Sequence, residues 1–229
     1  MRKVLLIFSM LHLSAVAAQP YMLDELAELD AYKFSSEDVE ISLALSAAPE
    51  HISSDATILV FDGNNYREAR AGKNGFVCLV ERAWAGQFYY VGAFWDPQIR
   101  SPICYNAEAA ENVLPVYLFR TRLALSGMSR DEIRDAVSAA VASGEFKAPS
   151  GTAMSYMMSA GQYLHPDIGR WLPHLMIWMP YTAQDSWGPN QLAGPDPVVF
   201  RNPGGPFAMV VIPYDEHRFI EPMHLPNDQ

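Results

Sequence analysis

The sequence lacks the motifs by which many enzymes are identified from sequence alone. It contains no H-E-x-x-H zinc helix, no G-x-S-x-G nucleophile elbow, no G-x-x-x-x-G-K-[ST] phosphate loop and no G-x-G-x-x-G dinucleotide fingerprint. These absences remove the simplest evidence for a zinc protease, an α/β-hydrolase or a nucleotide-binding protein. They do not exclude an enzyme, because folding can bring catalytic groups together from distant parts of a chain.

Positive charge and long apolar runs are also scarce. The 16 Lys and Arg residues are outnumbered by 26 Asp and Glu, which gives a formal net charge of -10. Nucleic acids and anionic membranes are bound through clusters of Lys and Arg, so we expect no nucleic-acid partner. Beyond the N-terminus no stretch approaches the roughly 20 apolar residues of a membrane span. The sequence identifies no cofactor, ligand or protein partner.

The N-terminus has the pattern of a secretory signal peptide, which we assign to residues 1–18. Arg2 and Lys3 precede the apolar segment VLLIFSMLHL, and small residues surround the expected cleavage point near Ala17. Loss of both cations would bring the net charge to about -12. No Cys follows the apolar segment, which excludes the bacterial lipoprotein route. The absence of N-x-S/T acceptors favours a bacterial protein, either periplasmic or secreted.

Only two cysteines are present, Cys78 and Cys104. In an oxidising compartment two cysteines most simply form a disulfide, which would stabilise the fold by roughly 3 to 4 kcal/mol in the chain-entropy model. The alternative is a reactive or metal-binding thiol pair. Nothing in the sequence favours that alternative, because the two residues are far apart and no C-x-x-C motif occurs.

The pattern along the chain predicts one α+β domain covering residues 19–229. Apolar spacing and capping residues predict four helices, at 21–34, 35–48, 106–127 and 129–144. We expect Pro115 to bend or divide the third, and Ser129 with Glu132 to form a capping box at the start of the fourth.

Strands are predicted between the helices and after them. Residues 57–84 are expected to form a meander, residues 86–106 a long packed loop, and four further strands to follow residue 150. The expected architecture is an antiparallel sheet of about five to seven strands with two to four helices packed on one face.

Three residues are candidates for catalysis. Glu81 and Arg82 follow a predicted strand beside Trp84, where aromatic shielding would raise the pKa of the carboxyl group and suit it to acid-base chemistry. The alternative is a solvated ion pair at the end of a strand. His217, within the run YDEHRF, is a candidate acid, base or metal ligand. Its alternative is a charged loop, because neighbouring residues on a strand point to opposite faces.

A set of methionines and one histidine forms a candidate site for a soft metal. On a strand, His174, Met176 and Trp178 share one face. If this face met the face of Met154 and Met158, thioether and imidazole groups would suit Cu(I). The alternative is an apolar core in which flexible methionines fill space against aromatic rings.

The segments NGFVCLVERAW, RSPICYN and SYMMSAGQYLHPDIGRWLPHLMIWMP resemble a group of exported bacterial proteins without an assigned activity. The resemblance covers most of the chain after the signal peptide. It implies an exported single domain, and it carries over no catalytic residue, ligand or partner.

Three classes of function are consistent with these observations. The first is a non-catalytic exported binding or structural domain, the second is an enzyme of hydrolytic type, and the third is a copper-binding protein. An enzyme would require polar candidates such as Glu81, Arg82, His174 and His217 to converge in one pocket.

Overall fold

The computed structural model describes residues 23–86, 88, 93–150, 152–187 and 199–214, with residues 199 and 200 described by their backbone alone. These ranges contain eight strands, which are β1 (Thr57–Phe61), β2 (Tyr66–Arg70), β3 (Val77–Glu81), β4 (Ser101–Tyr105), β5 (Met154–Met157), β6 (His174–Trp178), β7 (Val199–Arg201) and β8 (Met209–Pro213). They form one sheet with the order β2-β1-β3-β4-β5-β6-β8-β7. All neighbours are antiparallel except β1 and β3, which are parallel.

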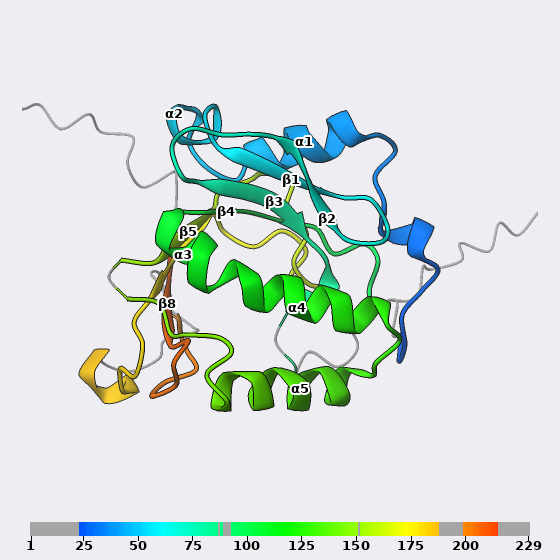
Figure 1. Cartoon of the computed structure of the whole chain (residues 1–229). Helices are drawn as coiled ribbons and strands as arrows, with labels where there is room; N and C mark the ends of the chain where they lie inside the picture. Colours follow the sequence, from blue (N-terminus) through cyan, green and yellow to red (C-terminus); the bar gives the residue numbers. More distant parts are fainter. Residues whose placement is uncertain (1–22, 87, 89–92, 151, 188–198, 215–229) are drawn as a thin grey trace, which may run out of the picture.

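Helices cover both faces of this sheet (Figure 1). The α-helices of the described ranges are α1 (Glu37–Leu45), α2 (Glu50–Ser53), α3 (Ala107–Asn112), α4 (Leu114–Leu125) and α5 (Arg130–Ala142). Single 3-10 turns are η1 (Leu29–Tyr32), η2 (Ala83–Ala85) and η4 (Gln184–Trp187). In this part of the chain no helix is both long and apolar enough to cross a membrane.

The alternation of side chains along the central strands produces two cores. Cys78 and Val80 of β3 pack with Ala44 of α1 on one face. Leu79 of β3 packs with Tyr117 of α4 in a larger aromatic core on the other face. Because both faces of β3 and β4 are covered, these strands are apolar on both sides, as expected for the centre of a sheet.

The connection between β2 and β3 crosses the start of β1, so the predicted meander is wrong in its pairing. β2 contains the polar sequence YREAR and lies at the sheet edge, while the apolar β3 takes the central position beside β1. Gly72 lies at the crossing. A Cβ there would be 2.2 Å from Thr57 N and 2.4 Å from the carbonyl carbon of Ala56. Only glycine allows the two backbones to approach this closely.

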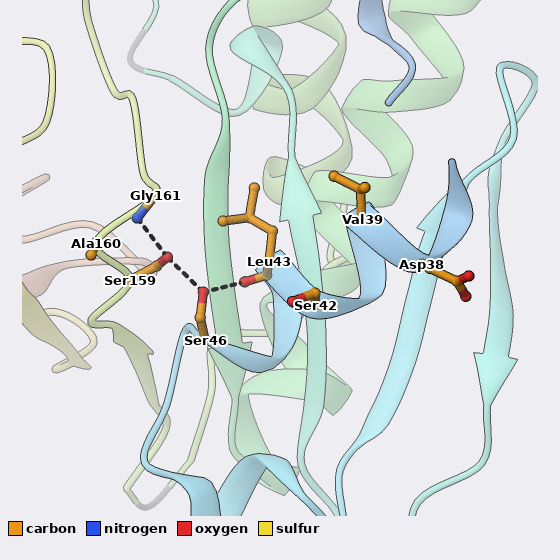
Figure 2. Close-up of a pocket in the computed structure, with 8 residues that line it drawn as sticks. All are labelled: Asp38, Val39, Ser42, Leu43, Ser46, Ser159, Ala160 and Gly161. Atoms are coloured by element: carbon orange, nitrogen blue, oxygen red, sulfur yellow. Dashed lines mark hydrogen bonds between the residues drawn. The ribbon is translucent and has the colours of Figure 1, made fainter. Parts of the chain in front are cut away.

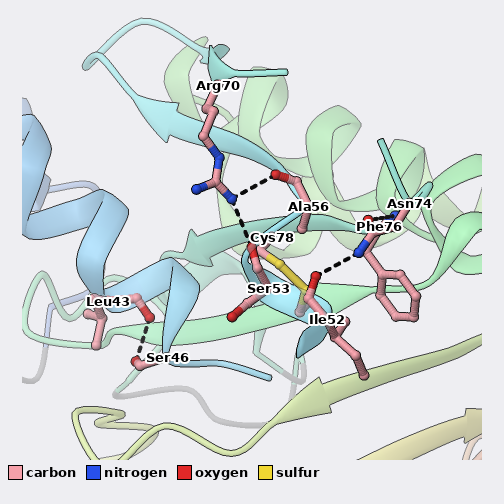
Figure 3. The surroundings of a disulfide bond; sticks show 10 residues. Leu43, Ser46, Ile52, Ser53, Ala56, Arg70, Asn74, Phe76 and Cys78 are labelled. Atoms are coloured by element: carbon pink, nitrogen blue, oxygen red, sulfur yellow. Dashed lines mark hydrogen bonds between the residues drawn. A yellow bond between two sulfur atoms is a disulfide. The ribbon is translucent and has the colours of Figure 1, made fainter. Parts of the chain in front are cut away.

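Hydrogen bonds hold this crossing in place (Figure 3). The Asn74 side chain donates to Ile52 O at 2.7 Å. Arg70 donates to Ser53 O at 2.8 Å and to Ala56 O at 3.0 Å. The crossing is therefore fastened both to the end of α2 and to the segment that leads into β1.

Cys78 and Cys104 form the predicted disulfide (Figure 3). They are directly opposite each other on the antiparallel strands β3 and β4, with Cα atoms 4.0 Å apart. Both residues are fully buried beneath α1. The bond links the two central strands across 26 positions of sequence.

The expected α+β class in a single domain is confirmed, with differences in detail. The sheet has eight strands rather than about five to seven, it contains one parallel pair, and its helices cover two faces rather than one. The division of the third predicted helix before Pro115 is confirmed, as is the capping box of Ser129 and Glu132.

Two local predictions are wrong. Residues 23–28 of the first predicted helix are irregular, and η1 is the only helical turn that follows them before α1. The end of the predicted long loop is the buried strand β4, even though it contains Pro102. Pro102 pairs with Val80 on β3, while β5 pairs with β4 only through Cys104 and Tyr105. The proline is therefore tolerated because no β5 residue lies opposite it.

Candidate functional site

Glu81 is buried at the end of β3, in the larger core. Its side chain is directed to the face of the sheet that α4 covers, and it is 7% exposed. The Tyr105 hydroxyl donates a hydrogen bond of 2.6 Å to Glu81 Oε1. Burial raises the pKa of Glu81 to about 7, although the Tyr105 hydrogen bond and the charge of Arg120 act in the opposite direction. Near neutral pH this carboxyl group can therefore hold or release a proton.

Among the cations of the described residues, Arg120 of α4 most resembles a ligand-binding group. Its guanidinium donates to the carbonyls of Ala85 at 3.1 Å and Gly86 at 2.6 Å, and it lies 4.3 Å from the centre of the Phe88 ring. Burial lowers the pKa of Arg120 to about 10, which leaves it charged at neutral pH. No ion pair to Arg120 is present within the described ranges.

The Nε atom of Arg120 is buried and has no hydrogen-bond partner among the described residues. Only two other buried side-chain atoms there share this condition, Ser155 Oγ and Gln162 Oε1. Buried polar groups in native proteins are nearly always paired, so an unpaired guanidinium N–H points to a partner that the described residues do not supply.

Glu81 and Arg120 line a cavity of about 550 Å³ between the sheet, α4, α5 and the loop before β8. This volume lies within the roughly 300–1,000 Å³ of typical ligand pockets. Its remaining lining is mostly apolar and includes Ile103, Met176 and Trp178 from the sheet with Val137 and Val141 from α5.

The cavity runs from the surface to a buried polar end. Arg134 and Asn202 line its outer part and are exposed, and Arg134 is already paired with Asp131 and Asp135. Glu81 and Tyr105, by contrast, are buried. A molecule that entered between α5 and the loop before β8 would pass apolar side chains before it reached these polar groups.

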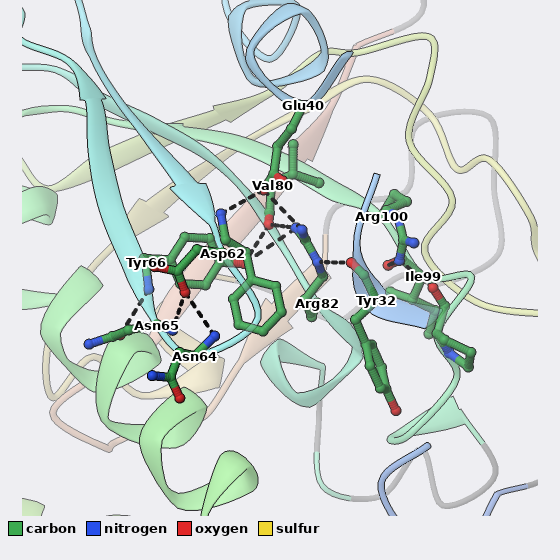
Figure 4. A network of polar contacts seen from close by, with 12 residues as sticks. Tyr32, Glu40, Asp62, Asn64, Asn65, Tyr66, Val80, Arg82, Ile99 and Arg100 are labelled. Atoms are coloured by element: carbon green, nitrogen blue, oxygen red, sulfur yellow. Dashed lines mark hydrogen bonds and ion pairs between the residues drawn. The ribbon is translucent and has the colours of Figure 1, made fainter. Parts of the chain in front are cut away.

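Arg82 does not belong to this cavity. Its side chain is fully buried and pairs with Glu40 of α1 at 2.9 Å, and its Nε donates to Tyr32 O at 2.8 Å (Figure 4). The rings of Phe34 and Phe61 lie 5.1 and 5.0 Å from its guanidinium carbon. All three guanidinium nitrogens hydrogen-bond within the protein, and the ion pair with Glu40 links α1 to the sheet.

The predicted pair of Glu81 and Arg82 is therefore separated by the fold. The two residues are neighbours in sequence, but Glu81 contacts Tyr105 in one core while Arg82 contacts Glu40. The alternative of a solvated ion pair at the strand end is also wrong, since both side chains are buried. His217 lies outside the described residues.

The candidate copper ligands do not converge. In the antiparallel pairing of β5 with β6, Met154 is opposite Ile177, and Met157 is opposite His174. Residues that are directly opposite share a face, so Met154 lies on the other face of the sheet from His174 and Met176. Met158 follows the strand, and its N–H donates to Ala47 O at the end of α1.

His174 itself is occupied within the fold. Its Nδ1 is 2.8 Å from Leu172 O, and its ring packs against Trp171 at 4.8 Å. Burial lowers the pKa of His174 to about 4, which favours the neutral imidazole. Within the described ranges, no group of three or more His, Cys, Asp or Glu residues is arranged to hold a metal ion.

A second hollow lies on the outer face of α1, where the hydroxyls of Ser46 and Ser159 are 2.6 Å apart (Figure 2). Ser46 donates to Leu43 O, and Ser159 accepts from Gly161 N. No His, Lys or carboxylate hydrogen-bonds to either hydroxyl in the described part of the chain, so neither serine has the adjacent base that activates a nucleophile. We regard this hollow as a surface groove.

The sequence pointed to Glu81 but not to its partners. Tyr105 lies on β4, which was not predicted as a strand because Pro97 and Pro102 favoured a loop. Arg120 lies in the middle of a helix. Two Arg residues, Arg120 and Arg122, interrupt the largely apolar run LPVYLFRTRLAL, and Arg120 was therefore only weakly marked as a residue of a site.

No protein-family model, curated protein or solved structure matches this chain. The cavity and the groups that line it are therefore the features from which a function can be inferred.

Proposed function

We propose that this protein is an exported binding domain that holds a small, largely apolar molecule in the cavity between the sheet and the helices α4 and α5. The observation that carries the proposal is the combination of a ligand-sized apolar cavity with a few polar groups, Glu81, Tyr105 and Arg120, in its lining. Such a combination is typical of small-molecule sites, in which apolar walls provide affinity and a few polar groups fix orientation.

Export is part of this proposal. It is supported by the signal-like pattern of the first 18 residues and by a buried disulfide of the kind that persists in oxidising compartments. The resemblance to exported bacterial proteins agrees with it. Detection of the protein outside the cytoplasm, cleaved near Ala17, would test this part independently of any ligand.

A fluorescent probe tests the binding function. A neutral apolar dye such as N-phenyl-naphthylamine should brighten when the protein lacking residues 1–18 is added, because the dye leaves water for the cavity. Val137→Phe should weaken this response, since Val137 lines the cavity and the larger ring would fill it. Val39→Phe is the matched control, because Val39 lies on α1 across the sheet and is 45% exposed.

Circular dichroism and urea unfolding would confirm that both variants remain folded. Equal dye binding by the two variants would place the dye outside the cavity and count against the proposal. The absence of any dye response in the unmodified protein would count against it as well.

Acid-base catalysis is a second candidate, and one observation favours it. The carboxyl group of Glu81 has a pKa of about 7 in an apolar cavity beside a tyrosine hydroxyl, which suits it to proton transfer at neutral pH. A hydrolase screen with apolar esters would test this candidate. Activity that persisted unchanged in Glu81→Gln would exclude Glu81 as the catalytic group. Among the described residues no comparable observation favours copper binding, since the pairing of β5 with β6 places Met154 on the other face of the sheet from His174 and Met176.

A further inference from the structure

The polar end of the cavity has a hydrogen-bonding pattern that constrains what it can bind. Arg120 contributes a buried N–H without a partner and a positive charge without an ion pair in the described ranges. Glu81 uses Oε1 to accept the Tyr105 hydrogen bond, and no described residue hydrogen-bonds to its Oε2. One unpaired donor and one free carboxyl oxygen therefore belong to side chains that line the same cavity, and the charges of Arg120 and Glu81 act on each other.

This inference rests on the proposed function. We propose that the ligand carries a carboxylate at one end of an apolar body and that Arg120 and a neutral, protonated Glu81 both bind this carboxylate. Arg120 would donate from its guanidinium, and the protonated Glu81 would donate from Oε2. A carboxylate accepts both bonds, because its two oxygens offer about four lone-pair sites.

Charge explains why the proton on Glu81 matters. When Glu81 is protonated, Arg120 is an uncompensated cation in an apolar cavity, and an anion entering the cavity neutralises it. When Glu81 is ionised, it compensates Arg120 itself and repels a second carboxylate. Binding of a carboxylate at alkaline pH therefore requires Glu81 to take up one proton from solution.

Among the described residues, the other charged and titratable groups around Glu81 do not supply an alternative cation. Tyr105 of β4 and Tyr117 of α4 both face it, and burial raises the pKa of each hydroxyl, so both remain neutral. Arg134 of α5 lines the outer part of the cavity, where Asp131 and Asp135 already pair with it. Among the described residues that line the cavity, Arg120 is thus the cation without a carboxylate partner.

Three probes with the same apolar body and different ends test the inference: decanoate, decanol and decylamine. Their affinities can be measured by displacement of the fluorescent dye near pH 6. We expect decanoate to bind at least about tenfold more tightly than decanol, because a charge-assisted bond to Arg120 is added. Decylamine should bind most weakly, since its cation faces Arg120. The affinity of decanoate should fall as pH rises above about 7, approaching tenfold per pH unit.

Two variants separate the roles of the two groups. Arg120→Met should remove the preference for decanoate and leave the affinity for decanol unchanged, which also shows that the cavity is intact. Arg122→Met, an exposed position on the same helix outside the cavity, is the matched control and should keep the preference. Glu81→Gln should keep the preference and lose its decline above pH 7. If Arg120→Met does not fold, Arg120→Lys provides the comparison, and it should retain the preference.

The outcomes distinguish the inference from the proposed function. Equal binding of decanoate and decanol by the unmodified protein would overturn the carboxylate inference and leave the apolar cavity as a binding site. Failure of all three probes to displace the dye would overturn both. A preference for decanoate that survives in Arg120→Met would show that another group binds the carboxylate, and this would also overturn the inference.

Discussion

Replacement of Glu81 by Gln should stabilise the protein at alkaline pH much more than at acidic pH. The pKa of Glu81 is raised from its ordinary value of 4.5 to about 7, mainly by burial. Below pH 4.5 the carboxyl group is protonated in both the folded and the unfolded chain. Between these two values the folded chain retains a proton that the unfolded chain has released. The free energy of unfolding therefore decreases as pH rises through this window.

The magnitude follows from the size of the shift. Since one pKa unit corresponds to about 1.4 kcal/mol, ionisation of Glu81 in the folded state costs about 3 kcal/mol once the pH is well above 7. Between pH 5 and pH 8 the expected change is about 2 to 3 kcal/mol. Gln has nearly the same shape, can still accept the Tyr105 hydrogen bond and does not ionise, so Glu81→Gln escapes this loss.

Urea unfolding near pH 5 and near pH 8 provides the measurement. The quantity of interest is the difference in unfolding free energy between the variant and the unmodified protein, because other titrating groups occur in both and cancel. Glu68→Gln is the matched control, since Glu68 is exposed on the edge strand β2 and its replacement should have a small effect at both pH values. A difference for Glu81→Gln that is the same at pH 5 and pH 8 would refute the reasoning about the buried carboxyl group.

Three further predictions concern the fold. Gly72→Ala should destabilise the protein by about 1 to 3 kcal/mol in urea unfolding, because the added Cβ would overlap backbone atoms at the chain crossing; an unchanged midpoint would show that this crossing can relax freely. Replacement of both Cys78 and Cys104 by Ala should lower the free energy of unfolding by about 3 to 4 kcal/mol, as expected for a closed loop of this length. When reductant is added to the folded, unmodified protein, labelling of the two thiols should proceed only as fast as the core opens. Burial lowers the pKa of His174 from 6.5 to about 4, so between these pH values the unfolded chain binds a proton that the folded chain does not. The free energy of unfolding should therefore fall by up to about 3 kcal/mol as pH drops through this window. His174→Asn should remove that fall, and an unchanged dependence of unfolding on acid pH in the variant would contradict the lowered pKa of His174.

Local sequence signals were reliable where the responsible interactions are local. The capping box of Ser129 and Glu132 depends on residues three positions apart, and the division of the helix at Pro115 depends on the missing N–H of one residue. The disulfide could also be predicted, because with two cysteines only one intramolecular pairing exists.

Predictions about pairing failed where the decision depended on competition between strands. The order β2-β1-β3 follows from the burial of β3 on both faces and the polarity of β2. The turn residues between the strands do not show which of the two strands takes the central position beside β1. The same holds for the copper hypothesis. A shift of one residue in the register of β5 and β6 exchanges the faces, and this register separates Met154 from His174.

The sequence by itself determined the α+β class, the disulfide and the positions of most helices and strands, since periodicity and capping act within a few residues. It also marked Glu81 as a carboxyl group among aromatic residues. Only the tertiary structure decided that Arg82 turns away to Glu40, that Tyr105 hydrogen-bonds to Glu81, and that Arg120 lines the same cavity. That decision depends on which face of each element is buried, and burial is a property of the assembled layers that no single segment contains.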